Sequence, residues 1–382
     1  MKIGIDLRMY RSSVAGIGRY SQNLVENLLR IDRDDQFVFF MRPDDIKEVN
    51  SKSEIRNPKH KVVEVDIPHY SISEQTKLPK IIEKEKVDLM FFTNTNYPVR
   101  YRGKFIVAIH DLTLYFFPQT ARKNGFVRRK AFNFVLKSAV KKSLKIITDS
   151  ENTKKDIMDV FKTSSDKIAV IPLAADDPTS LKLRGASKNL DATVGEIKQK
   201  YAIGDSPVIL YVGQFRAHKN IPNLVRTFNI VREKIPAKLV LIGKLDPNYT
   251  ELIETIDKSP RKRDIVMPGF VSDEDLSAWY KLSTCYAFPS LYEGFGLPAL
   301  EAMQAGLPVV TSDRSSLPEV CQEAALYFDP ENTDDMANKI KKVLQNQDIR
   351  NDLIEKGKIQ TAKFSWRKTA EEALKIFKSV AQ

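Results

Sequence analysis

Short apolar runs alternate with longer amphipathic runs along this chain of 382 residues, and the alternation occurs in two sets. Such alternation is typical of parallel strands joined by covering helices, so it predicts an α/β fold. The first set predicts strands at residues 2–7, 36–41, 61–67, 89–93, 105–110, 145–148 and 168–172. The second set predicts strands at residues 208–212, 238–242, 265–267, 284–288, 308–311 and 325–328. We therefore expect two doubly wound parallel sheets.

A change in composition separates the two sets. Residues 174–189 contain Asp-Asp-Pro and then a mixture of Gly, Ser and Lys in place of periodic apolar residues, which is typical of a linker. We predict one domain over 1–173, a second over 190–365 and a final helix within 366–382. Because ligands of doubly wound sheets bind beyond the carboxyl ends of the strands, we expect the two domains to face each other across a ligand-binding cleft.

The composition excludes several classes of protein. No apolar run approaches the ~18 residues that a membrane-spanning helix needs. Asp6 and Arg8 stand where a signal peptide would have its apolar stretch, so a cytoplasmic protein is expected. The 2 cysteines, Cys285 and Cys321, and the 4 scattered histidines exclude a disulfide framework and a Cys/His zinc cluster.

The positive charge of the chain is concentrated in its first part. The formal net charge is +12; residues 1–173 hold 32 Lys and Arg against 21 Asp and Glu, and the remainder holds 29 against 28. Such asymmetry indicates a negatively charged partner for the first domain. A nucleic acid, an anionic membrane surface and a phosphorylated substrate all satisfy this requirement.

Segment 287–306, with the sequence AFPSLYEGFGLPALEAMQAG, contains several candidate site residues. A predicted strand leads into a loop with Glu293, and Pro298 then opens a helix that ends at Gly306. A phosphate fits there, because loop glycines allow close approach and the helix start presents unpaired N–H groups. Glu293 and Glu301 suit hydroxyl groups of a sugar or ribose. An ordinary strand-to-helix turn explains the segment equally well.

Segment 211–220, YVGQFRAHKN, places two permanent cations after another predicted strand. Gly213 follows the strand directly, and Arg216 and Lys219 follow the glycine. A guanidinium binds phosphate oxygens through paired donors and an ammonium acts as a point charge, so together they suit a diphosphate and a leaving group that gains charge. The alternative is a solvated basic turn.

Two features of the first domain have weaker signals. Gly16 and Gly18 lie in the segment AGIGRY before a helix predicted over about 18–29, but the full dinucleotide fingerprint is missing, which disfavours a nicotinamide dehydrogenase. His110 ends a predicted strand, where a polar side chain is expected to face the cleft. A lone histidine is more often structural than catalytic.

Segment 123–145 is basic and interleaved with apolar residues, and it has no acidic residue. Its 8 basic positions are 123, 128, 129, 130, 137, 141, 142 and 145. Basic residues beside an apolar face are typical of a helix on an anionic membrane, where each contributes about 1 kcal/mol. A core helix with a solvated basic back is the alternative.

These segments together resemble family 4 of the retaining glycosyltransferases, enzymes with the GT-B fold of two Rossmann-like domains facing a central cleft. EGFGLPALE is similar to the family's E-x7-E motif, with the glutamates at Glu293 and Glu301. Other similar segments are GIGRY, IHDL, TDSENTKKDI, VIPLAAD, YVGQFRAHKN, MPGFVSDEDL and SSLPEV. The resemblance implies that the C-terminal domain binds a nucleotide-sugar, that the N-terminal domain binds the acceptor, and that the last helix crosses back to the N-terminal domain.

The resemblance also implies roles for individual residues. Arg216 and Lys219 would hold the diphosphate. Glu301 would bind the ribose and Glu293 the hydroxyls of the donor sugar. The remaining implied donor contacts are His110 to the sugar, Gly16, Gly18, Gly213, Phe295, Gly296 and Leu297 near the phosphates or sugar, and Phe270 and Val271 beside the base. Catalytic roles are implied for Glu293, His110, Arg216 and Lys219.

The implied reaction retains the anomeric configuration, with the departing phosphate helping to take the acceptor's proton. No metal is implied, because Arg and Lys replace it, and the acidic run 273–275 is predicted to be a helix start. Two positions depart from the family pattern: Gln214 and His218 stand where arginine is frequent. The division of charge between Arg216 and Lys219 therefore stays open.

Similar sequences favour GDP-mannose as donor, with UDP-glucose and UDP-N-acetylglucosamine as alternatives, and a glycan or lipid-linked acceptor of surface polysaccharide assembly. The basic segment 123–145 predicts a peripheral position at the inner face of the cell membrane. A GT-B nucleotide-sugar epimerase is one rival, and a catalytically decayed binding or scaffold protein is another. Nucleic acid is not expected as a partner, because recognised nucleic-acid modules are missing.

Overall fold

The computed structural model describes residues 1–382 apart from 11–15, 50–53, 121–124, 176–189, 248 and 382. The chain divides into two compact units: unit 1 consists of residues 1–173 and 365–382, and unit 2 of residues 174–364. The predicted linker 174–189 lies almost wholly outside the described residues.

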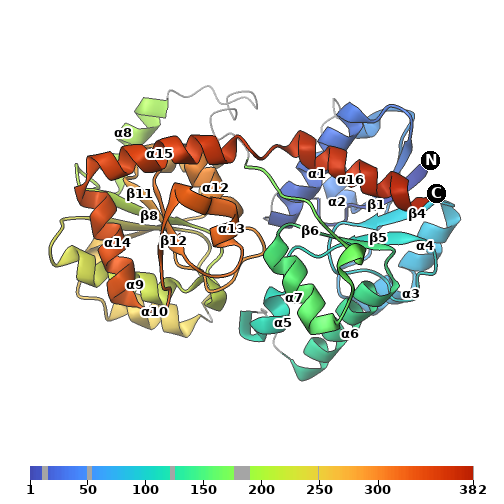
Figure 1. Ribbon diagram of the computed structural model, residues 1–382, viewed down its shortest axis with the longest axis horizontal. Helices are drawn as coiled ribbons and strands as arrows, with labels where there is room; N and C mark the ends of the chain where they lie inside the picture. Colours follow the sequence, from blue (N-terminus) through green and yellow to red (C-terminus); the bar gives the residue numbers. More distant parts are fainter. Residues whose placement is uncertain (11–15, 50–53, 121–124, 176–189, 248, 382) are drawn as a thin grey trace. The chain divides into compact units, whose positions relative to one another are not determined.

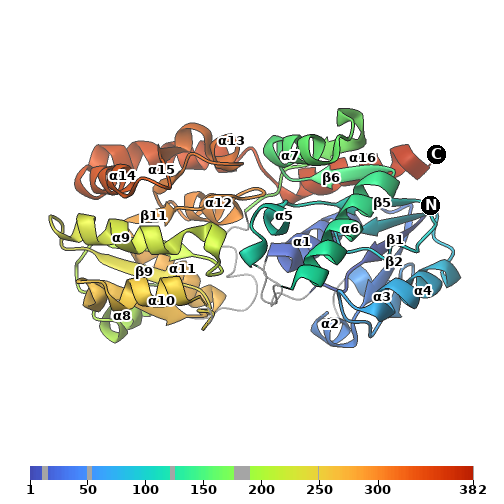
Figure 2. The same ribbon diagram turned by 90° about the horizontal axis from the view of Figure 1, so that it is seen from below.

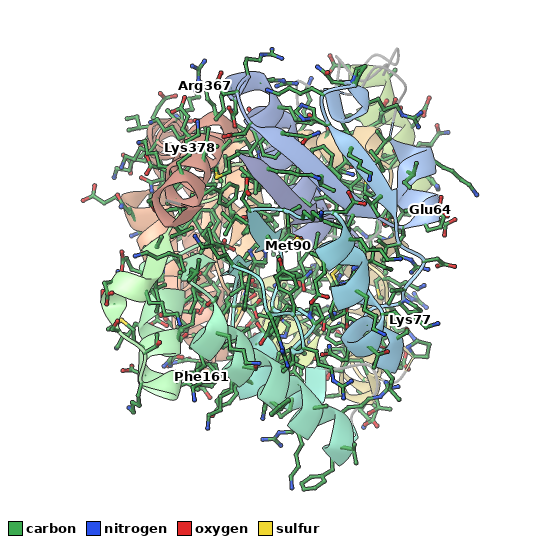
Figure 3. The ribbon with its side chains drawn as sticks, turned by 90° about the vertical axis from the view of Figure 1, so that its right-hand side faces the viewer. Glu64, Lys77, Met90, Phe161, Arg367 and Lys378 are labelled. Atoms are coloured by element: carbon green, nitrogen blue, oxygen red, sulfur yellow. The ribbon has the colours of Figure 1, made fainter. Side chains whose placement is uncertain are left out.

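Unit 1 is built on a sheet whose seven described strands are all parallel and follow the order β3-β2-β1-β4-β5-β6-β7. The strands are β1 (Lys2–Asp6), β2 (Gln36–Met41), β3 (Lys61–Glu64), β4 (Leu89–Phe92), β5 (Phe105–Ala108), β6 (Lys145–Thr148) and β7 (Ile168–Val170). Figure 3 shows Glu64 on the edge strand β3 and Met90 on β4 in the middle of the unit. Strands β4 and β5 are buried along their whole length, which explains their continuous apolar sequences.

The last helix of the chain completes unit 1. Helices of this unit are α1 (Gly16–Ile31), α2 (Pro43–Glu48), α3 (Ile72–Thr76), α4 (Leu78–Lys84), α5 (Thr113–Phe116), α6 (Phe126–Lys142), α7 (Glu151–Phe161) and α16 (Trp366–Ala381). Figure 1 shows α16 beside α1, against which it packs. The rings of Phe377 and Phe91 lie 5.0 Å apart, and the Thr369 hydroxyl donates a hydrogen bond of 2.8 Å to the Pro172 carbonyl. The expected return of the last helix is confirmed.

Unit 2 contains a second parallel sheet, with the order β10-β9-β8-β11-β12-β13 among its described strands. The strands are β8 (Val208–Val212), β9 (Lys238–Ile242), β10 (Ile265–Gly269), β11 (Cys285–Phe288), β12 (Val309–Ser312) and β13 (Ala325–Phe328). The helices are α8 (Leu190–Lys200), α9 (Ile221–Arg232), α10 (Thr250–Asp257), α11 (Asp273–Leu282), α12 (Leu297–Gln304), α13 (Leu317–Cys321), α14 (Thr333–Gln345) and α15 (Gln347–Thr361). Figures 1 and 2 show helices on both sides of this sheet.

Side chains at the helix starts explain several boundaries. The Ser150 hydroxyl accepts a hydrogen bond from the Thr153 amide and so caps α7. Ser272 caps α11 in the same way, through the Asp275 amide. The acidic run 273–275 therefore forms the first turn of a helix, as predicted, where carboxylates are favoured by the helix dipole.

The predicted fold class is confirmed, because both parallel sheets are present. Five predicted strands agree with the structure at both ends, namely β2, β6, β8, β9 and β13. Strand β5 ends at Ala108, two residues before the predicted end. The Ile109 amide still donates to the Ile147 carbonyl of β6 at 2.9 Å, and the chain enters a loop at His110. Among the described residues, no helix is both long and apolar enough to cross a membrane.

Candidate functional site

Three neighbouring strands of unit 2 end at the same edge of the sheet. Strand β8 lies between β9 and β11, so the loops that follow these strands begin side by side. The Gly213 amide donates to the Ile242 carbonyl at 2.9 Å, and the Gly243 amide donates to the Gly269 carbonyl at 3.0 Å. A Cβ atom on Gly243 would lie 2.0 Å from the Gly213 carbonyl oxygen, so only glycine fits at this close approach of two backbones.

The loop after β11 forms the candidate phosphate cradle. Gly296 has a φ of +99° and immediately precedes α12, with Pro298 in the helix's first turn. A Cβ atom on Gly296 would also lie 2.7 Å from Leu317 Cδ2. Phe295 and Leu297 flank this glycine at the start of the helix, a position suited to an anion. Within the first turn Pro298 has no N–H group, and the Ala299 amide donates to the Gly296 carbonyl at 2.9 Å.

Both predicted glutamates of this segment are buried. Glu293 is 8% exposed in the loop and Glu301 is 7% exposed on α12. The backbone of Glu293 is fixed by two hydroxyls of the loop after β12: Ser315 and Ser316 each donate to its carbonyl, at 2.6 and 3.0 Å. Ser315 also accepts a hydrogen bond from the Glu293 amide.

The two predicted cations lie at this edge and both have carboxylate partners. Lys219 Nζ lies 2.5 Å from Glu293 Oε1, and Arg216 Nη1 lies 3.8 Å from Asp246 Oδ2. The loops after β8 and β11 are further joined by a hydrogen bond of 2.8 Å from the Leu291 amide to the His218 carbonyl. The structure therefore brings Lys219 into contact with Glu293 and places Arg216 in the same loop as Lys219.

His218 carries no charge near neutral pH. Burial, together with the positive charges of Lys219 and Arg216, lowers the pKa of its ring to about 2. The neutral histidine at this position therefore does not replace the arginine that is frequent in similar sequences.

Phe270 and Val271 directly follow β10, the edge strand next to β9. The Phe270 side chain is 90% exposed, whereas most aromatic side chains of the unit are buried. An exposed aromatic ring at the carboxyl edge of the sheet is suited to stacking on a planar ring.

In unit 1, the glycines of the first loop lie at the start of a helix. Gly16 is the first residue of α1 and Gly18 is buried in the same turn. The preceding loop residues 11–15 lie outside the described residues. The predicted helix therefore begins two residues earlier than expected, and both glycines belong to it.

His110 makes hydrogen bonds through both ring nitrogens within unit 1. Nδ1 lies 2.9 Å from Asp149 Oδ2, and Nε2 lies 2.9 Å from the Thr93 carbonyl oxygen. The ring of Tyr20 contacts it edge-on, with 4.5 Å between centroids. Burial by itself lowers the pKa of His110, but the Asp149 carboxylate raises it to about 9. The imidazole is thus a protonated ring that donates two hydrogen bonds.

A second buried charge network lies at the same edge of unit 1. The Arg8 guanidinium binds Asp6 Oδ2 at 2.7 Å and Glu74 Oε1 at 2.8 Å, and neither the Arg8 nor the Glu74 side chain is exposed. Thr93 joins this network to His110, because its hydroxyl donates to the Asp6 carbonyl at 2.8 Å.

Three residues that contact candidate site residues are not predicted from the sequence, namely Asp149, Asp246 and Ser315. Asp149 follows β6, a neighbour of the strand that precedes His110, so its contact with His110 could have been predicted only from the order of the strands in the sheet.

Among the described residues, no group of three or more His, Cys, Asp or Glu is arranged to hold a metal ion.

We expect Asp149→Asn to lower the pKa of His110 from about 9 to below the ordinary value of 6.5, because burial would then dominate. The raised pKa stabilises the native state fully below pH 6.5, and this contribution is lost as the pH rises through about 9. NMR titration of the histidine and denaturant unfolding between pH 6 and 10 measure both effects. Asp159→Asn, at an exposed position on α7, is the control; an unchanged His110 titration in Asp149→Asn would refute the assignment.

We expect Gly296→Ala to destabilise the protein by about 1–3 kcal/mol, because alanine is strained at a φ of +99° and its Cβ would contact Leu317. Gly195→Ala is the matched control: it lies within α8 with no atom within 4 Å of the new Cβ, so it should stabilise by up to about 1 kcal/mol. Denaturant unfolding of both variants measures the difference. Equal effects would show that the loop does not constrain Gly296.

Two family descriptions together account for most of the chain. Residues 14–177 match "Glycosyltransferase Family 4", and residues 194–360 match "Glycosyl transferases group 1". The O-antigen chain mannosyltransferase B of Escherichia coli is 26% identical over 99% of this chain and 100% of its own length. The MMP alpha-(1->4)-mannosyltransferase of Mycolicibacterium hassiacum is 28% identical over 69% of this chain and 60% of its own. The serotype-specific mannosyltransferase WbdA of Escherichia coli is 29% identical, but the chain spans only 29% of its length.

Solved structures share the fold. Sucrose-phosphate synthase from Thermosynechococcus elongatus superimposes with a TM-score of 0.75 at 19% identity, covering 100% of this chain and 99% of that one. WaaG, a glycosyltransferase involved in lipopolysaccharide biosynthesis, gives a TM-score of 0.71 at 14% identity, covering 98% and 99%. Anabaena Alr3699/HepE in complex with UDP-glucose gives a TM-score of 0.75 at 14% sequence identity, and the match covers 100% of both chains. The chain therefore belongs to the family 4 type of glycosyltransferases, and its two α/β units have the GT-B fold.

Proposed function

We propose that this glycosyltransferase moves mannose from GDP-mannose to a glycan or lipid-linked acceptor in surface polysaccharide biosynthesis. The observation that carries the proposal is the convergence of Arg216, Lys219 and Glu293 at the carboxyl edge of the unit 2 sheet. Relatives named as mannosyltransferases, two of them acting in O-antigen synthesis, support the choice of sugar and of acceptor class.

Each proposed role follows from the chemistry of the side chain. The guanidinium of Arg216 and the ammonium of Lys219 bind the diphosphate and stabilise the charge that it gains as it leaves. Glu293 accepts hydrogen bonds from the sugar and Glu301 from the ribose, while Phe270 and Val271 flank the base. The N–H groups near Phe295, Gly296 and Leu297 face the phosphates, and Gly213 lets the backbone approach them.

The proposed reaction retains the anomeric configuration. The bond between the anomeric carbon and the phosphate oxygen breaks, and the bond to the acceptor oxygen forms on the same face of the sugar. The acceptor's proton passes to the departing phosphate. His110 contacts the sugar in this proposal, which requires Nε2 to exchange the Thr93 carbonyl for a sugar hydroxyl. No step uses a metal ion.

We also propose that α6 binds the anionic inner face of the cell membrane. Phe126, Val127 and Phe134 are 73%, 78% and 64% exposed, although they are apolar. Arg128, Arg129 and Lys130 are exposed between them. The buried residues of α6 are Leu136, Ala139 and Val140, all in its second half, whereas residues 126–131 at its start are all exposed. Apolar side chains among basic ones suit a membrane interface.

The donor is tested by thermal shift with GDP, UDP, ADP and their sugar conjugates, because a ligand that binds the native state raises its stability. We expect a selective shift with GDP and GDP-mannose. Glu293→Ala and Lys219→Ala should remain folded and lower kcat by at least about 100-fold. Lys258→Ala, at an exposed position in unit 2, should leave kcat unchanged. A selective shift with UDP and turnover of UDP-glucose would replace the donor, and no shift with any nucleotide would favour a decayed binding protein.

The membrane surface is tested with the triple variant Arg128→Glu, Arg129→Glu and Lys130→Glu. We expect weaker cosedimentation with vesicles that contain anionic lipid, because each basic residue near the surface contributes about 1 kcal/mol. The matched control carries the same change of charge on α3–α4, at the exposed lysines Lys77, Lys80 and Lys84. Equal binding by the two triple variants would show that α6 is an ordinary solvated helix.

A further inference from the structure

Four charged side chains occupy the candidate diphosphate site of unit 2, and they form two pairs. Lys219 is held by Glu293 at 2.5 Å, within hydrogen-bond distance. Arg216 faces Asp246 at 3.8 Å. The cations that the proposed function assigns to the donor phosphates are thus already next to carboxylates of the same unit.

Sheet order explains why each cation has a carboxylate of its own. Arg216 and Lys219 follow β8, Asp246 follows β9 and Glu293 follows β11. Strands β9 and β11 are the two neighbours of β8, so carboxylates reach the cations from both sides. The arrangement is built into the fold of unit 2 and does not depend on unit 1.

The four charges compensate one another. His218 adds none, because its pKa of about 2 keeps it neutral, and the buried Glu301 adds a further carboxylate to the same segment. A diphosphate that approaches this edge therefore meets cations whose charge is already neutralised. Its oxygens gain the full attraction of these cations only when the carboxylates move away.

The pairs differ in strength. The Lys219 and Glu293 side chains are 15% and 10% exposed, whereas those of Arg216 and Asp246 are 20% and 26% exposed. The first pair is in direct contact and more buried, so breaking it costs more than separating the second. Asp246 is the easier carboxylate to displace.

We propose that the donor binds by counter-ion exchange, in which the diphosphate replaces Asp246 on Arg216 and Glu293 on Lys219. This inference rests on the proposed function and assigns a role to Asp246. The exchange frees the Glu293 carboxylate for the sugar hydroxyls at the moment when the sugar arrives. After transfer, the return of both carboxylates to the cations favours release of the nucleoside diphosphate.

The inference predicts that removing a carboxylate strengthens the binding of a nucleoside diphosphate. Asp246→Asn removes the competing charge and should lower the Kd of GDP by about two- to fivefold, the range for a partly exposed ion pair. Glu293→Gln should lower the Kd of GDP by more, because its pair is closer and more buried, and should nevertheless abolish turnover. A glutamate that only contacts the sugar would leave the Kd of GDP unchanged, because GDP has no donor sugar.

Isothermal titration calorimetry at fixed salt measures these Kd values for GDP, UDP and inorganic pyrophosphate. Asp257→Asn is the matched control, since it removes the same charge from an exposed position of unit 2. Asp246→Ala is a second variant that removes the oxygen atoms altogether, and circular dichroism checks that every variant is folded. Guanosine and uridine, which lack phosphate, should bind all variants alike.

Each outcome has a definite meaning. Tighter binding of diphosphates by Asp246→Asn and Asp246→Ala, but not by Asp257→Asn, supports the exchange. Binding of GDP or UDP to the wild type with equal or weaker binding to the Asp246 variants overturns the exchange and leaves the proposed function standing. No binding of any phosphate ligand to any variant overturns both.

Discussion

The ion pair between Lys219 and Glu293 connects the two segments on which the unit 2 site depends. A buried charge needs a partner, and each of these side chains supplies one for the other. The same two loops are joined by the hydrogen bond between Leu291 and His218, and Ser315 and Ser316 fix the Glu293 backbone from a third loop. The position of each chemical group is therefore set by packing between loops that begin at adjacent strands.

Unit 1 uses the same principle with different residues. His110, Thr93 and Asp6 follow or end neighbouring strands, and hydrogen bonds connect them in sequence. Arg8 adds a buried guanidinium that is balanced by two carboxylates. Each unit thus has buried charged side chains at the carboxyl edge of a parallel sheet, and the cationic ones have carboxylate partners: His110 and Arg8 in unit 1, Lys219 and Arg216 in unit 2.

The sequence was sufficient to predict both sheets and the chemistry that single residues offer. Parallel strands are buried on both faces, so the apolar runs at 36–41 and 208–212 coincide with β2 and β8. The sequence predicts Arg216, Lys219 and Glu293 as site residues because they are charged residues that follow strand ends close to glycines. Asp149 and Asp246 were not found, because their roles depend on which strands are neighbours. The sequence placed His110 at a strand end, facing the cleft. It could not show that the ring donates a hydrogen bond to the Thr93 carbonyl, because a backbone acceptor is not visible in the residue pattern.

The distribution of charge along the chain distinguishes donor binding by unit 2 from the proposed binding of an anionic surface by unit 1. Residues 174–382 hold 29 basic and 28 acidic residues, and the candidate diphosphate site within them is itself compensated. The donor phosphates therefore do not account for the basic excess of the chain, which lies in residues 1–173. Part of that excess is on α6, where basic side chains stand beside exposed aromatic rings and Lys130 Nζ lies 4.4 Å from the centre of the Phe126 ring. An excess of charge that the donor does not use supports the proposal that unit 1 meets an anionic surface.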